Sequence, residues 1–160
     1  MTELRLPVPV SFEFFPPNTP VGSEKLKTVV RELAAARPEF FSVTYGAGGA
    51  TRDKTLATVA DIAALGHEAA PHLSCVGSTK EGISQILGTY REQKIRRLVA
   101  LRGDLPSGTA TAGEFRYASE LISYIREKEG SDWHIEVAAY PEYHPQQRYA
   151  RRDLEHFAAR

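Results

Sequence analysis

The sequence has a single cysteine, Cys75, among its 160 residues. One cysteine excludes an internal disulfide and a cysteine-rich metal cluster. Neither charge sign is in excess, because 20 Lys and Arg are matched by 20 Asp and Glu, so no basic surface predicts binding to nucleic acid or acidic lipid. No apolar run approaches the roughly 20 residues of a membrane span, and the first residues lack the apolar core of a signal peptide. We therefore expect a soluble, cytoplasmic protein without nucleic-acid or membrane partners.

The sequence instead alternates strand-like and helix-like segments. Apolar runs, two of them rich in aromatic and β-branched residues, predict strands at residues 8–15, 40–45, 69–76, 97–102 and 135–140. Apolar residues at helical spacing lie between them. The three clearest stripes are Leu26, Val29, Val30, Leu33 and Ala34; Ile83, Ile86, Leu87 and Tyr90; and Tyr117, Leu121, Tyr124 and Ile125. No linker separates these segments, so we expect one domain built from five βα units.

Acidic residues stand at the ends of two predicted strands. Glu13 lies in the run V-S-F-E-F-F-P-P, and Asp104 lies in the run L-V-A-L-R-G-D-L-P. Burying an unpaired carboxylate costs several kcal/mol or forces it to take up a proton, so folding alone rarely selects an acid there. Both residues are therefore candidates for function.

Repeated βα units predict a parallel sheet in one of two architectures. A doubly wound open sheet would be complete at this length, whereas a barrel of eight units needs about 250 residues. A site drawn from every successive strand is typical of the barrel. Polar residues at or just beyond the C-terminal strand ends are Glu13, Thr44, His72, Asp104 and Tyr140. We expect a (βα)8 barrel of the TIM type, with about the first five units in this chain, whose last predicted helix at 146–160 has no ending signal.

The small-residue loop at 46–51 is a weak signal for phosphate binding and supports the alternative of a dinucleotide-binding Rossmann domain. That fold needs an acidic residue about 20 positions on, at the end of the next strand. Glu68 instead precedes that strand. We expect no metal site, because His72 and Cys75 are three apart in a strand and point to opposite faces, and the other histidines lack ligand spacing.

Five blocks of the sequence resemble methylenetetrahydrofolate reductase of the bacterial type. They are V-S-F-E-F-F-P-P, F-S-V-T-Y-G-A-G-G-A-T-R-D-K-T, A-A-P-H-L-S-C, L-V-A-L-R-G-D-L-P and A-A-Y-P-E-Y-H-P. The resemblance implies an eight-unit barrel that holds FAD and reduces 5,10-methylenetetrahydrofolate to 5-methyltetrahydrofolate with NADH or NADPH, in one-carbon metabolism and methionine biosynthesis. It also implies small-molecule substrates and a homo-oligomer when complete. Residues 1–160 would form the N-terminal five-unit portion of a single FAD-binding barrel domain.

The resemblance implies catalytic roles for both acidic residues. Glu13 would be the general acid that protonates a folate nitrogen as the methylene bridge opens, and its aromatic neighbours in sequence are expected to raise the carboxyl pKa. Asp104 would lie beside the flavin and the folate, where its charge resists electron accumulation on the flavin. Two structural alternatives stay open. Glu13 could be a strand-end residue paired with an arginine, and Asp104 could cap a turn.

The resemblance also assigns residues to FAD. They are Thr44, His72, Arg102, Gly103, Asp104, Tyr117, Ala118, Tyr140, His144, Asp153 and Arg160. Taken singly, Tyr117 fits a helix core and His144 a loop, so these two assignments depend on the family order. Arg160 stands where relatives often have lysine, and a forked guanidinium is not equivalent to an ammonium group.

Three functions therefore remain open at the level of sequence. The first is a flavin-dependent folate reductase, the second an NAD-binding Rossmann-like dehydrogenase, and the third a non-catalytic, truncated binding fragment. Colour separates the first two, because bound FAD makes a protein yellow and a nicotinamide cofactor does not.

Overall fold

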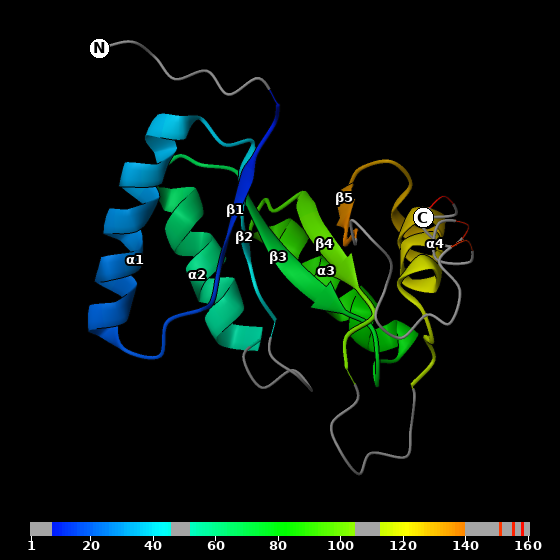
Figure 1. Cartoon of the computed structure of the whole chain (residues 1–160). Coiled ribbons are helices and arrows are strands. Elements are labelled where there is room, and N and C mark those ends of the chain that lie inside the picture. The colour runs from blue at the N-terminus through cyan, green and yellow to red at the C-terminus, as the bar shows by residue number, and fades with distance from the viewer. Residues whose placement is uncertain are drawn as a thin grey trace.

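The computed structural model describes residues 8–45, 52–104 and 113–139, together with Arg151, Glu155 and Ala158. Within these ranges strands and helices alternate along the chain (Figure 1). The strands are β1 (Ser11–Phe14), β2 (Phe40–Val43), β3 (Ala69–Ser74), β4 (Arg97–Leu101) and β5 (His134–Val137). The helices are α1 (Pro20–Leu33), the short 3-10 helix η1 (Ala34–Ala36), α2 (Arg52–Ala64), α3 (Lys80–Glu92) and α4 (Ala118–Glu129). The helix predicted at 146–160 lies almost entirely outside the described residues.

The described strands pair in chain order, β1-β2-β3-β4-β5, and each neighbouring pair is parallel. A barrel adds each new strand beside the previous one, whereas a doubly wound sheet starts from an inner strand and breaks chain order. The predicted α/β fold with parallel strands is therefore confirmed, and the observed order does not fit the Rossmann alternative.

The two faces of the sheet differ in character because successive strand residues point to opposite sides. On the outer face Phe41 is fully buried and stacks with Phe12 and Phe14, at ring-centroid distances of 6.0 and 5.8 Å. The helices are arranged around this face, as Figure 1 shows. The inner face carries polar residues instead, and Ser42 and His72 are buried there.

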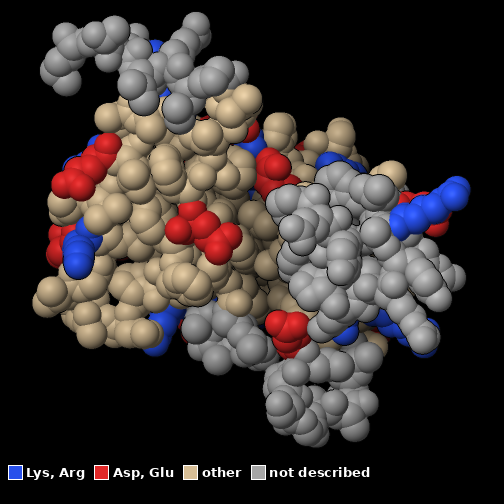
Figure 2. Space-filling view, in the orientation of Figure 1, with Lys and Arg blue, Asp and Glu red and all other residues tan. Residues whose placement is uncertain are grey.

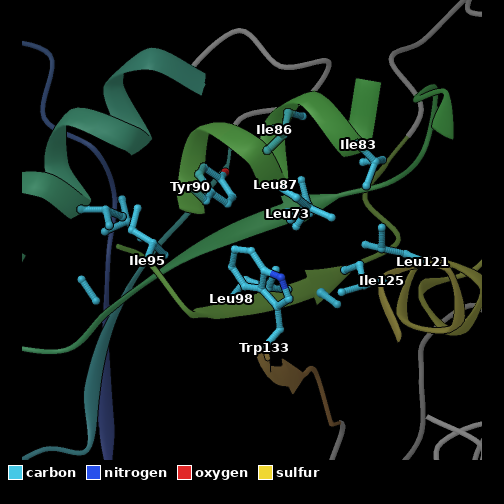
Figure 3. Close-up of a cluster of buried hydrophobic side chains, with 14 of the residues drawn as sticks. Leu73, Ile83, Ile86, Leu87, Tyr90, Ile95, Leu98, Leu121, Ile125 and Trp133 are labelled. Carbon is cyan, nitrogen blue, oxygen red and sulfur yellow. The ribbon is translucent and has the colours of Figure 1, made fainter. Parts of the chain in front are cut away.

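The core lies between the sheet and the helices. Figure 3 shows Leu73 of β3 and Leu98 of β4 gathered with side chains of α3 and α4, and with the buried indole of Trp133. The stripe predicted on α3 is confirmed, since Ile83, Ile86, Leu87 and Tyr90 are all buried. Burying a large side chain of this kind contributes about 1.5–3 kcal/mol, so this layer fixes β3 and β4 against the helices.

Two sequence predictions of local structure are wrong. Tyr117 is not part of the α4 core but is 57% exposed, because it is the N-cap residue that precedes the helix. The first strand is shorter than the predicted run 8–15, since Pro9 has no N–H to pair with a neighbouring strand and Phe15 is exposed.

The surface of the described residues carries both charge signs. Figure 2 shows acidic and basic side chains interspersed on one face, with no broad basic patch. No helix within the described ranges is both long and apolar enough to span a membrane.

Candidate active site

A cavity of about 650 Å³ opens on the inner face of the sheet. All five strands contribute to it, because alternate residues of each strand point to this side. Its walls include Ser11, Glu13, Phe40, Ser42, Thr44, Tyr45, His72, Val99, Leu101 and Glu136. In sheets built from βα units the ligand site lies at the C-terminal ends of the strands. Glu13, Thr44 and His72, all predicted site residues, belong to this end of their strands and face the same cavity.

Glu13 and His72 approach each other across β2. Nε2 of His72 lies 3.4 Å from Oε2 of Glu13. In the strand register Glu13 is level with Ser42, and Ser42 is level with Ala70. The intervening Ser42 and the Ala70 level with it, two residues before His72 on β3, are both small, so the longer glutamate can reach past them to His72. The structure therefore pairs Glu13 with a histidine, and not with the arginine that the structural alternative required.

The two members of the pair differ in exposure. The His72 side chain is 8% exposed, whereas that of Glu13 is 56% exposed. Burial lowers the pKa of His72 below its ordinary value, and the nearby Glu13 carboxylate opposes this shift only in part. His72 is therefore neutral at neutral pH. Its Nε2 is buried and has no hydrogen-bond partner among the described residues, because the 3.4 Å contact lacks hydrogen-bond geometry.

The aromatic residues beside Glu13 in sequence do not surround its carboxylate. Phe12 and Phe14 point to the outer face, where they stack on Phe41. Phe15 lies beyond the strand and is 78% exposed. The rings that flank Glu13 in sequence therefore lie away from its carboxylate, because neighbouring residues of a strand point to opposite faces. The environment of Glu13 is instead the inner cavity and His72.

Thr44 is fixed at the end of β2 by its backbone. Its N–H donates to the carbonyl of Phe14, at 2.9 Å, and its carbonyl accepts from the buried Thr55 hydroxyl of α2, at 2.8 Å. Both bonds hold the backbone of the first residue after β2 beside β1. This arrangement aims the Thr44 side chain into the cavity that contains Glu13 and His72.

The turn after β4 packs tightly on the end of β3. Gly103 has φ of +78°, and a Cβ placed on it would lie 1.7 Å from Oγ of Ser74. The Ser74 hydroxyl donates to the Arg102 carbonyl at 3.1 Å, and the N–H of Val76 donates to the same carbonyl at 2.8 Å. Only glycine fits this close approach. Asp104 follows the turn and is exposed.

The start of α4 lies against the same turn through Cys75. Its Sγ is 3.8 Å from the Arg102 carbonyl and 3.7 Å from the Tyr117 carbonyl. Burial raises the pKa of the Cys75 thiol to about 11, so it remains protonated and serves as a weak donor, not as a nucleophile. Ala118, the first residue of α4, is buried, whereas the Tyr117 side chain is exposed.

Sequence comparisons identify the family of this chain. The family model described as methylenetetrahydrofolate reductase matches residues 6–160. The chain belongs to the methylenetetrahydrofolate reductase family. It is 43% identical over 155 residues to 5,10-methylenetetrahydrofolate reductase of Pectobacterium carotovorum subsp. carotovorum, covering 96% of this chain and 51% of that protein. The same enzyme of Escherichia coli (strain K12) is 42% identical over 155 residues, with the same coverage.

A plant relative extends the comparison. Methylenetetrahydrofolate reductase (NADH) 1 of Arabidopsis thaliana is 40% identical over 140 residues, covering 84% of this chain and 24% of that protein. The chain spans about half the length of the bacterial relatives named above. The family has the TIM-type barrel fold, and the five described strands of this chain follow one another in the parallel, sequential order that such a barrel has.

In this reductase-family chain the structure brings some predicted site residues together and leaves others aside. Glu13, Thr44 and His72 share the inner cavity. Arg102 and Tyr117 are linked through Cys75, which contacts the carbonyl of each, and Gly103 and Ala118 follow them in the chain. Tyr140, His144, Asp153, Arg160 and the loop at 46–51 lie outside the described residues.

A second cavity, of about 450 Å³, lies on the outer side between α3 and α4. Two of the three carboxylates in its lining already accept hydrogen bonds from backbone N–H groups at helix ends. Glu114 accepts from the N–H of Lys80 at 2.7 Å, and Glu120 accepts from the N–H of Arg116 at 2.6 Å. The described residues also contain no cluster of three or more potential metal ligands. The inner cavity is therefore the better candidate for the active site of this family member.

Sequence reasoning missed an arginine at the opposite end of the inner face. Arg97 stands at the start of β4, and its Nη1 lies 2.5 Å from Oε1 of Glu136 and 4.0 Å from Oε2 of Glu39. Its Nε lies 3.7 Å from Oε1 of Glu68. Its guanidinium carbon lies 4.7 Å from the centre of the Phe40 ring. Strand alternation alone would have placed Arg97 on the inner face. Its acidic partners come from three other segments, and only the register of the strands shows that they lie beside it.

We expect Arg97→Leu to lower the free energy of unfolding by about 1–3 kcal/mol, because Glu136 would lose its closest partner in a partly buried site. Urea unfolding of the full-length protein measures this loss. Arg151→Leu is the control, since Arg151 is 90% exposed in its pair with Glu155 and should change stability by less than about 0.5 kcal/mol. Equal losses in both variants would contradict a role for Arg97 inside the barrel.

Proposed function

We propose that the protein containing this chain reduces 5,10-methylenetetrahydrofolate to 5-methyltetrahydrofolate, with NADH or NADPH as reductant and FAD as cofactor, in one-carbon metabolism and methionine biosynthesis. Residues 1–160 would be the N-terminal five-unit portion of a single FAD-binding barrel domain. The complete protein would be a cytoplasmic homo-oligomer. The observation that carries the proposal is the position of Glu13: an acid at the C-terminal strand ends, facing a cavity shared with Thr44 and His72.

The residues on this side of the sheet fit a flavin. Thr44 and the buried His72 place polar groups in the wall of the cavity. Gly103 has no side chain, so the turn after β4 can pack closely on the end of β3. The described residues proposed to hold FAD are Thr44, His72, Arg102, Gly103, Asp104, Tyr117 and Ala118, and the resemblance adds Tyr140, His144, Asp153 and Arg160. When bound, FAD would supply a carrier for the hydride between the nicotinamide and the folate.

The chain's own contribution to the chemistry is a proton. Opening the methylene bridge leaves a folate nitrogen that must be protonated, and a carboxyl group can supply this proton only if it stands within hydrogen-bond reach. Glu13 is 56% exposed, and its exposed side faces the cavity. We assign Glu13 as the general acid and Asp104 as the negative charge that tunes the flavin.

The proposal is tested on the purified full-length protein without oxygen. We expect a yellow protein whose flavin absorbance is bleached by NADH or NADPH and returns when methylenetetrahydrofolate is added. A colourless protein that binds nicotinamide would favour the dehydrogenase alternative. A protein that binds neither cofactor would favour a non-catalytic fragment.

We expect Asp104→Asn to raise the flavin reduction potential, because removing a nearby anion makes the electron-rich reduced ring less unfavourable. Asp104 is exposed, so the expected increase is about 30 mV, which corresponds to about 1.4 kcal/mol for a two-electron couple. Potentiometric titration of the full-length protein gives the value. Asp132→Asn, at an exposed residue before β5, is the control and should leave the potential unchanged. An unchanged potential in both variants would place Asp104 away from the flavin.

A further inference from the structure

The contact between His72 and Glu13 has a feature that an ordinary surface ion pair lacks. The imidazole is buried, and its Nε2 has no hydrogen-bond partner among the described residues although a carboxylate oxygen lies 3.4 Å away. A buried nitrogen without a partner is costly, so native structures rarely keep one unless something binds it. Glu13 is exposed and has three side-chain torsions, so a small rotation would complete a hydrogen bond to Nε2.

The described residues place few ionisable groups around this pair. The others that they contribute to the walls of the cavity are Glu39, Tyr45 and Glu136. Glu39 and Glu136 lie beside Arg97, which offsets part of their charge. Burial raises the pKa of Tyr45, so it is neutral at neutral pH. From β4 the strand partner of His72 is the apolar Val99, and on β2 the register places Ser42 level with Ala70, two residues before His72. Among the described residues in the cavity walls, Glu13 is therefore the ionisable group in closest reach of His72.

Resting on the function proposed above, we propose that Glu13 and His72 share one proton as a pair, with the neutral imidazole accepting through Nε2 the hydrogen bond of the protonated Glu13 carboxyl. His72 is then a positioning residue for the acid. The exposed side of Glu13 faces the cavity, so a substrate entering there removes water from the carboxylate. Removing water from both partners disfavours the charged pair and favours the neutral one. The proton then rests on Glu13, where the folate nitrogen can take it, and water returns a proton to the pair afterwards.

Two substitutions separate positioning from proton sharing. His72→Gln keeps an amide oxygen that can accept a hydrogen bond but cannot hold a proton at neutral pH. His72→Ala removes both functions and leaves space for water. We use the full-length protein at saturating FAD, with flavin content and thermal unfolding measured for each variant. Stopped-flow then follows two half-reactions against pH: flavin reduction by NADH or NADPH, and reoxidation by methylenetetrahydrofolate.

We expect the folate half-reaction at its low-pH plateau to fall about tenfold in His72→Ala and to stay within about threefold of wild type in His72→Gln. In both variants the rate of the folate half-reaction should begin to fall at a pH at least about one unit lower than in the wild type. The reason is that two interacting groups titrate as a pair, and without His72 the proton is held by a carboxyl alone. The nicotinamide half-reaction should keep its pH profile.

A second measurement does not depend on turnover. Proton–nitrogen correlation spectra of the full-length protein with labelled histidine report which imidazole nitrogen carries the proton, and the His72→Gln spectrum assigns the signal. With a folate analogue bound, we expect His72 to be neutral with its proton on Nδ1. A proton on Nε2, or wild-type pH profiles in both variants, would overturn the proposal that Glu13 and His72 share one proton. Failure of the wild type in both half-reactions would instead overturn the proposed function itself.

Discussion

We expect Glu13→Gln to abolish the reduction of methylenetetrahydrofolate in the full-length protein and to leave flavin reduction by NADH or NADPH within about threefold of wild type. The amide has the size of the carboxyl but cannot give up a proton, and only the folate half-reaction needs one. A general acid contributes about 10²–10⁴-fold to such a step. Stopped-flow of the two half-reactions measures both effects separately.

Glu39→Gln provides the matched control. Glu39 is another carboxylate in the wall of the same cavity, and its side chain is 54% exposed against 56% for Glu13. It precedes β2, at the end of the sheet where Arg97 lies, away from the C-terminal strand ends. We expect this variant to keep both half-reactions. If Glu13→Gln lost both half-reactions to the same extent, Glu13 would support the flavin or the fold and would not be the acid.

We expect Gly103→Ala to lower both the stability of the protein and its affinity for FAD. A methyl group at this position would overlap Oγ of Ser74, 1.7 Å away, and lie 3.1 Å from Cγ1 of Val76, in a backbone conformation with φ of +78°. The conformation costs an alanine about 1–2 kcal/mol, and the overlap adds about 1–3 kcal/mol. We therefore expect stability to fall by about 2–5 kcal/mol and FAD affinity to fall at least about tenfold, because the turn must move.

Gly66→Ala separates the two causes. Gly66 has φ of +86°, but nothing lies within 4 Å of the added methyl group. The Gly66→Ala variant should lose only the conformational part of the stability, about 1–2 kcal/mol, and should keep its FAD affinity. Denaturant unfolding and flavin titration of the full-length variants test both values. Equal losses in the two variants would show that the contact between Gly103 and Ser74 has no special role.

Much of the fold follows from sequence pattern alone. The apolar run F-S-V in β2 and the α3 stripe that ends at Tyr90 both gave correct elements, because a parallel sheet covered by helices requires long apolar runs and one apolar helix face. The grouping of Glu13, Thr44 and His72 also followed, since the C-terminal ends of parallel strands meet at one edge.

The pairs within the site did not follow from sequence. The contact of Glu13 with His72 depends on the register of three strands, on the small Ser42 between them and on the small Ala70 next to His72 on the inner face of β3. Arg97 meets Glu136 only because β4 and β5 are aligned in one register. Tyr117 was assigned to the core because its spacing fits the helix period, although the helix begins one residue later. Periodicity identifies a face, whereas register and caps decide which atoms meet.

The most direct test of the central claim is a crystal structure of the full-length protein with FAD and a folate analogue bound. The account predicts the flavin ring on the inner face of the sheet, at the C-terminal strand ends. Asp104 should lie beside the ring, and the Glu13 carboxyl within hydrogen-bond distance of a folate nitrogen and of Nε2 of His72. A flavin bound in the outer cavity between α3 and α4, or a folate away from Glu13, would contradict it.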